Sequence, residues 1–175
     1  DTVTSGAIAA DQTICNGGDP VAFTSTTAGS GSTGATISYR WELNTNLTTP
    51  SWTVISGANA ATYDSGALTT TTQFRRTTIS TLNSVACEST PTSVVTVTVQ
   101  DTVTSGAIAA DQTICNGGDP VAFTSTTSGS GSTGATISYR WELNTNLTTP
   151  SWTVISGANA ATYDSGALTT TTQFR

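Results

Sequence analysis

The chain repeats itself almost without change at a period of 100 residues. Residues 1–75 recur at 101–175 with one difference, Ala28 against Ser128, so 74 of 75 positions are identical. This period is too long for a solenoid unit and fits one small β-sandwich domain per repeat. We expect a complete domain at 1–100 and a second at 101–175 that lacks its last strand. The chain is then a segment of a longer tandem array.

Alternation of apolar and polar residues predicts an all-β fold. Residues 37–41 and 95–99 alternate strictly, which is the pattern of a half-buried strand. Shorter β-rich segments lie at 21–24, 52–55 and 73–79. Six or seven short strands per repeat, with turn signals about every ten residues, are typical of an immunoglobulin-like sandwich. No Gly/Pro linker separates the two repeats, which predicts tandem immunoglobulin-like β-sandwich domains arranged end to end.

Missing residue types exclude several classes of function. The chain has no His and no Met, and all five of its basic residues are Arg. Without His or Lys there is no Ser-His-Asp triad, no His-ligated zinc, no Schiff base and no P-loop lysine. We therefore expect no catalytic residues and no enzyme activity. The net charge of −6 argues against nucleic acid or an anionic membrane as partner. No apolar run approaches transmembrane length in this window.

The cysteines indicate a structural disulfide rather than a metal or redox site. Each complete repeat carries two, Cys15 and Cys87, and the second repeat has only Cys115. Their spacing does not resemble CxxC. A Cys15–Cys87 bridge in an extracellular domain would close a loop of roughly 70 residues and contribute about 4 kcal/mol. Two alternatives stay open: a bridge from Cys15 to the second cysteine of the next repeat, and free thiols.

Tryptophans are the strongest candidates for the core and for ligand contact. Trp41 and its copy Trp141 occupy the position where immunoglobulin-like sandwiches place their core tryptophan. Trp52 and its copy Trp152 are expected to pack nearby. The alternative for this second pair is an exposed, sugar-stacking platform.

Charged residues show no catalytic or metal-binding pattern. The acids are scattered, no DxDxDG loop is present, and Asp101 stands alone at the junction, so solvated surface acids are favoured over a calcium site. We expect no cofactor. Arg75-Arg76 on a strand predicts one arginine facing solvent and the other against a carboxylate or the sheet edge.

Short motifs follow one another in a fixed order along the repeat: 11–20 (DQTICNGGDP), 39–42 (YRWE), 52–58 (WTVISGA), 68–76, Cys87 and 94–99. This order resembles the immunoglobulin-like repeats of giant Bacteroidetes cell-surface proteins, above all the SprB-type gliding-motility adhesins. The resemblance covers the whole 100-residue unit. Asp-Thr-Val at 1–3 and 101–103 is also similar to the O-glycosylation acceptor motif of that phylum, with Thr2 and Thr102 as acceptors.

The resemblance implies a place and a role for the protein. It implies export by the type IX secretion system, anchoring at the outer membrane and extracellular display on the cell surface as a long filament. The expected function is a non-catalytic structural or adhesive repeat for gliding motility and surface attachment. The expected partners are neighbouring repeats, a substratum or polysaccharide surface, and the secretion and gliding machinery. A carbohydrate-binding module using Trp52 is the alternative.

Overall fold

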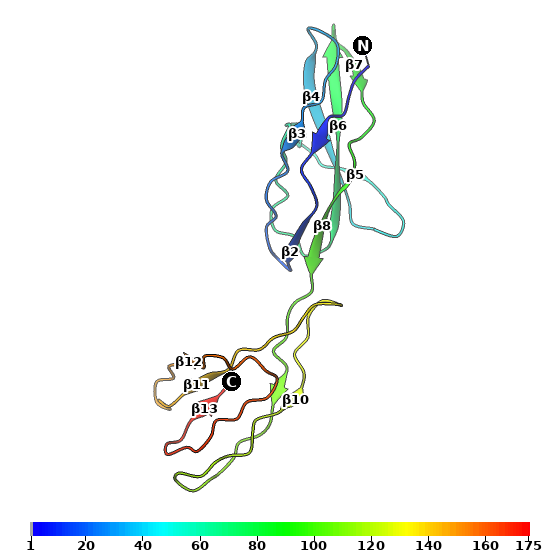
Figure 1. The fold of residues 1–175 in the computed structure, drawn as a ribbon. Coiled ribbons are helices and arrows are strands. Elements are labelled where there is room, and N and C mark those ends of the chain that lie inside the picture. Colours follow the sequence, from blue (N-terminus) through cyan, green and yellow to red (C-terminus); the bar gives the residue numbers. More distant parts are fainter. Residues whose placement is uncertain (1) are drawn as a thin grey trace. The chain divides into compact units, whose positions relative to one another are not determined.

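The structure, a computed structural model, describes residues 2–175 and has no helix among them. The all-β prediction is therefore confirmed. The chain divides into two compact units, unit 1 at Asp1–Asp101 and unit 2 at Thr102–Arg175 (Figure 1). Asp1, with which the first predicted domain and the first Asp-Thr-Val motif begin, lies outside the described residues. The end-to-end arrangement of immunoglobulin-like domains stays a prediction.

The main sheet of unit 1 is organised around one long strand, β6. Along one edge β6 pairs with β4, and along the other it pairs with β8 at one end and β7 at the other. β5 adds to β4, and β2 adds to β8. Every pair is antiparallel except β2–β8, which is parallel. The strands are β2 (Gln12–Cys15), β4 (Thr36–Asn44), β5 (Thr53–Val54), β6 (Thr72–Leu82), β7 (Val85–Glu88) and β8 (Val95–Gln100).

A smaller layer packs against the main sheet and makes unit 1 sandwich-like. In this layer β1 (Ala7–Ile8) pairs antiparallel with β3 (Ser25–Thr27). Isolated bridges extend it, at Thr4–Ser30, Gly18–Leu68 and Phe23–Tyr63. The sequence predicted a strand at 21–24, but only Phe23 pairs there.

Aromatic rings from both layers form the core of unit 1. The Phe23 ring lies 4.9 Å from that of Phe74 and 5.9 Å from that of Trp41, centroid to centroid. Tyr63 closes the group at 5.5 Å from Trp41. Trp41 is fully buried, and its Nε1 donates to the Ala60 carbonyl at 2.9 Å, so its one polar atom is satisfied. The buried core residues are Phe23, Trp41, Phe74, Val95 and Val97.

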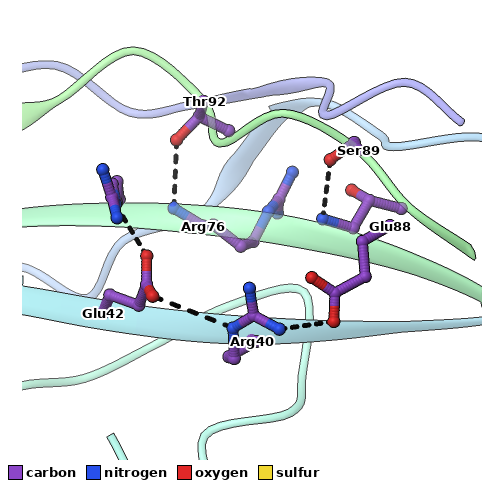
Figure 2. Close-up of polar contacts among 8 residues, drawn as sticks. Arg40, Glu42, Arg76, Glu88, Ser89 and Thr92 are labelled. Atoms are coloured by element: carbon purple, nitrogen blue, oxygen red, sulfur yellow. Dashed lines mark hydrogen bonds and ion pairs between the residues drawn. The ribbon is translucent and has the colours of Figure 1, made fainter. Parts of the chain in front are cut away.

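Two side chains complete the edge of β6 between β7 and β8. Pro91 has no N–H to offer a neighbouring strand, and the ladder is interrupted around it. Here the Arg76 N–H donates to Thr92 Oγ1 at 3.1 Å, and the Thr78 N–H donates to Ser89 Oγ at 3.0 Å (Figure 2). The hydroxyls thus replace backbone carbonyls, and β6 stays paired along its length.

Unit 2 shows what the same sequence does without a counterpart of residues 76–100. Its strands are β9 (Ala107–Ile108), β10 (Ser125–Thr127), β11 (Glu142–Asn144), β12 (Thr153–Val154) and β13 (Gln173–Phe174). Residues 112–115, copies of the β2 residues, are not a strand, because β8 has no copy in this chain. A hollow of about 860 Å³ lies there between residues 111–116 and 168–174.

We expect Phe74→Ala to lower the free energy of unfolding of unit 1 by about 3–5 kcal/mol, because it leaves a cavity at the centre of the core. Phe74 is 1% exposed. The measurement is urea denaturation followed by circular dichroism. Val21→Ala is the control, since Val21 is 78% exposed and its loss should cost no more than about 0.5 kcal/mol. Equal effects of the two substitutions would contradict this core.

Candidate functional site

Charged side chains gather on the face of the β4–β6 sheet that points away from the core. The register places Glu42 opposite Arg75, and the Arg75 Nε donates to Glu42 Oε2 at 2.6 Å. Arg40, two residues before Glu42 and on the same face, donates from Nη1 to Glu88 Oε1 at 2.5 Å. Its Nε lies 3.9 Å from Glu42 Oε1 (Figure 2). We call this row, Glu88–Arg40–Glu42–Arg75, the charge ladder.

Each charge of the ladder has an opposite charge beside it. The hydrogen bond with Glu88 raises the pKa of Arg40 against the lowering effect of its burial. In unit 2 the hydrogen bond from Arg175 lowers the pKa of Glu142, the copy of Glu42. In both cases the opposite charge favours the ionised form of the group. The ion pairs join side chains of β4 to those of β6 and β7 across the sheet.

Arg75 also covers one face of Trp52. Its guanidinium carbon lies 4.1 Å from the centre of the Trp52 ring, and Arg175 lies 4.2 Å from that of Trp152. Both tryptophans are half-buried. A cation held over an indole face is attracted by the ring's negative potential. A sugar stacking on that face would have to displace an arginine that Glu42 also holds.

Buried Asn44 fixes the loop that presents Trp52. Its Nδ2 donates to the Gln73 Oε1 at 2.8 Å and to the Asn46 carbonyl at 3.1 Å. Its Oδ1 accepts from the backbone N–H groups of Asn46 and Ser51. All of the amide's groups are used inside the protein, which makes this loop a fixed feature of the sheet edge.

The sequence singled out Trp52 but gave no sign of the charge ladder, whose Arg75 covers the ring, or of Asn44, which holds the loop before it. The alternation in 37–44 does place the three β4 residues on one face. No local sequence pattern shows that β6 places Arg75 opposite Glu42, or that β7 places Glu88 beside Arg40.

Arg76 corrects the expectation for the Arg75-Arg76 pair. Arg75 does meet a carboxylate, but Arg76 is fully buried on the core side instead of facing solvent. Its guanidinium donates to the Ala61 carbonyl at 2.7 Å, to the Ser5 carbonyl at 3.3 Å and to Ser25 Oγ. It also lies over the Tyr39 ring at 4.4 Å. Burial lowers the pKa of Arg76, against a raising effect of the neighbouring Tyr39.

The cysteines do not form the expected Cys15–Cys87 disulfide. All three are free and exposed. Cys15 pairs with Gln100 in the β2–β8 ladder, beyond the Thr72 end of β6, whereas Cys87 pairs with Ser80. At ~3.3 Å per residue the two lie roughly 35 Å apart along the sheet, far beyond the reach of a disulfide. A bridge to the second cysteine of a following repeat stays a prediction.

The remaining predicted residues lie as follows. Trp141 is 4% exposed in unit 2, in the place of Trp41. Thr2 and Thr102 are exposed and outside strands, which leaves their hydroxyls accessible. Across residues 2–175, no group of three or more His, Cys, Asp or Glu side chains is arranged to hold a metal ion. Nor does any described helix have the length and apolar character to span a membrane.

Comparison with known protein families identifies the family to which this chain belongs. Residues 4–101 and again 104–175 match the family described as Domain of unknown function (DUF8696). The chain belongs to the DUF8696 family. The family domain begins at the same position in each repeat, so the chain carries one DUF8696 domain in unit 1 and the matching part of another in unit 2. No curated protein matches the chain.

We expect all three thiols of the folded chain to react with a thiol reagent without prior reduction, because each cysteine is exposed and unpaired. Cys87→Ser should lower the number of reactive thiols by one and change the free energy of unfolding by no more than about 0.5 kcal/mol. Thiol titration measures the number of reactive thiols, and urea denaturation measures the free energy of unfolding. An intramolecular cross-link seen by mass spectrometry of non-reduced peptides would contradict this placement.

We expect Arg75→Ala to lower the free energy of unfolding of unit 1 by about 1–3 kcal/mol, because it leaves Glu42, 8% exposed, without its closest donor. The indole N–H resonance of Trp52 should shift as the ring loses its cover. Arg75→Lys is the matched control: it keeps the charge but not the planar stacking, so it should cost less. An unmoved Trp52 resonance in Arg75→Ala would refute the contact.

Proposed function

We propose that these DUF8696 domains are non-catalytic structural repeats of a large bacterial cell-surface adhesin, which they extend as a filament or stalk. The observation that carries the proposal is the near-identity of two successive domains, 74 of 75 positions. Repeats that differ so little can be gained or lost without changing the unit. Such a chain varies in length while its surface stays the same.

The structure of unit 1 supports a role as a spacer. The four charges of its ladder are paired with one another along the sheet, and its longest strand, β6, has 11 residues. At ~3.3 Å per residue this strand alone spans about 36 Å. Many domains in series would carry an adhesive end far from the membrane. An array also offers avidity, because weak contacts per domain add up while each one releases quickly.

Gliding motility, type IX secretion and anchoring at the outer membrane follow from the resemblance of the motifs to SprB-type adhesins. They are part of the proposal on that basis. The exposed hydroxyls of Thr2 and Thr102 suit an extracellular protein that is O-glycosylated at these positions.

A carbohydrate-binding module is the second candidate, with Trp52 and Trp152 as stacking residues. The arginine over each ring weighs against it. Binding of the chain to polysaccharides, lost in the Trp52→Ala and Trp152→Ala double variant, would favour this candidate over a spacer.

The decisive test removes the repeats in frame from the native protein and keeps all other parts. We expect surface filaments to shorten or disappear and adhesion or gliding to fall. A second strain replaces the repeats with unrelated β-sandwich domains of equal number, which should restore the function of a spacer. Unchanged filaments, adhesion and gliding after removal would overturn the proposal.

A further inference from the structure

The first and last strands of the main sheet of unit 1 pair in parallel. β2 and β8 match Gln12 with Val97 and Cys15 with Gln100, and no other strand pair among the described residues is parallel. Load from the N-terminal side reaches β2 through the chain before Gln12, and the chain after Gln100 leads to unit 2. Tension along the protein therefore pulls on β2 through its start and on β8 through its end.

The chain enters and leaves unit 1 at opposite ends of the main sheet. The chain enters beside the β7 half of β6, where the Ser5 carbonyl accepts from Thr78 Oγ1 at 3.1 Å. It leaves after Gln100, past the opposite end of β6, where Thr72 pairs with Val97 (Figure 1). Tension thus draws the two parallel strands past each other along their length. Every hydrogen bond between them is loaded at once, instead of one after another as in peeling.

We propose that the β2–β8 pair is a mechanical clamp that lets each DUF8696 domain bear tension without unfolding. The inference deepens the proposed role as a filament or stalk, because a surface filament that attaches to a substratum is pulled. Residues 4–8, which pair with 25–30, precede the clamp and yield before the full load reaches β2.

Side chains extend the clamp beyond its four matched residue pairs. The Thr96 N–H donates to Asp11 Oδ1 at 2.8 Å, one residue before β2 begins. The Gln12 side chain exchanges two hydrogen bonds of 2.8 Å with the backbone of Val21, which ties the start of β2 to the neighbouring turn. Ile14 packs against the core, and Val97 is fully buried, so water has little access to one side of the pair.

Unit 2 is an internal comparison, because it has the β2 sequence without a β8. Residues 112–115 form no strand there. In this chain unit 2 therefore has no clamp, and under tension it should extend at lower force than unit 1.

The first experiment stretches single molecules of the full chain in two geometries. Cys87→Ser and Cys115→Ser leave Cys15, which is exposed, as the one reactive thiol. Handles at the two termini load β2–β8 in shear, whereas handles at Cys15 and the C-terminus pull the pair apart from one end. We expect unit 1, which releases roughly 300 Å of chain, to unfold at severalfold higher force in shear. Equal forces in the two geometries would overturn the clamp.

The second experiment compares two equivalent substitutions at constant force between the termini. Asp11→Ala removes the hydrogen bond to Thr96 and should shorten the lifetime of unit 1 about tenfold. Asp64→Ala is the matched control, since Asp64 Oδ1 accepts from the Gly66 N–H at 3.1 Å in a turn off the loaded path. It should change the lifetime less than about twofold. Equal shortening by both substitutions would refute the proposal.

The clamp and the proposed function fail separately. If unit 1 resists shear in single molecules but adhesion is unchanged after removal of the repeats, the clamp is supported and the proposed function is overturned. If removal of the repeats abolishes adhesion but unit 1 unfolds at equal force in both geometries, the proposed function is supported and the clamp is overturned.

Discussion

The structure depends on the pairing of β6 along both of its edges. β6 holds β4 on one side and β7 and β8 on the other, and β8 in turn holds β2. Unit 2 shows the consequence of shortening this strand, because only Gln173–Phe174 remains of it. The copy of β4 then shrinks from Thr36–Asn44 to Glu142–Asn144. A strand needs a partner for its backbone groups, so sequence identity over 74 positions does not give unit 2 the sheet of unit 1.

The alternation of β6 divides unit 1 chemically. Phe74 faces the core and Arg75 faces the charge ladder, but Arg76 and Thr78 continue the core face as polar residues. In one half of unit 1 the two layers are thus joined by aromatic packing, and in the other half by hydrogen bonds to backbone carbonyls. Gly29 belongs to the polar half, because a Cβ there would lie 2.0 Å from Thr78 Oγ1. The Gly-Ser-rich segment at 29–34 is thus in part a close packing contact, since a Cβ at Gly31 would likewise lie 2.1 Å from Ser80 Oγ.

Local patterns were sufficient for the longer strands and the core tryptophan, and insufficient for the short strands and for the pairing between distant strands. Period-2 alternation located residues 37–41 and 95–99 and pointed Trp41 inward. The distance between Cys15 and Cys87 depends instead on how β2, β8, β6 and β7 follow one another across the sheet. Each pairing joins residues far apart in the chain, and no local pattern encodes that order. The burial of Arg76 was hidden for the same reason, since its partners Ser5, Ser25 and Ala61 come from three other segments.

Near-identity of the repeats acquires a physical meaning if the domains bear tension. Domains connected in series all carry the same force, so the weakest one sets the force at which the chain lengthens. A substitution that weakens the β2–β8 pair in one domain cannot be compensated by its neighbours. Uniform repeats avoid such a weak member. Identical neighbours also have a cost, because strands of adjacent domains can exchange during folding. In unit 1 the residues around β2 act against such exchange: Asp11 and Gln12 bind their own domain's backbone at Thr96 and Val21. The contacts that hold the clamp under load are thus the ones that favour its formation within a single domain.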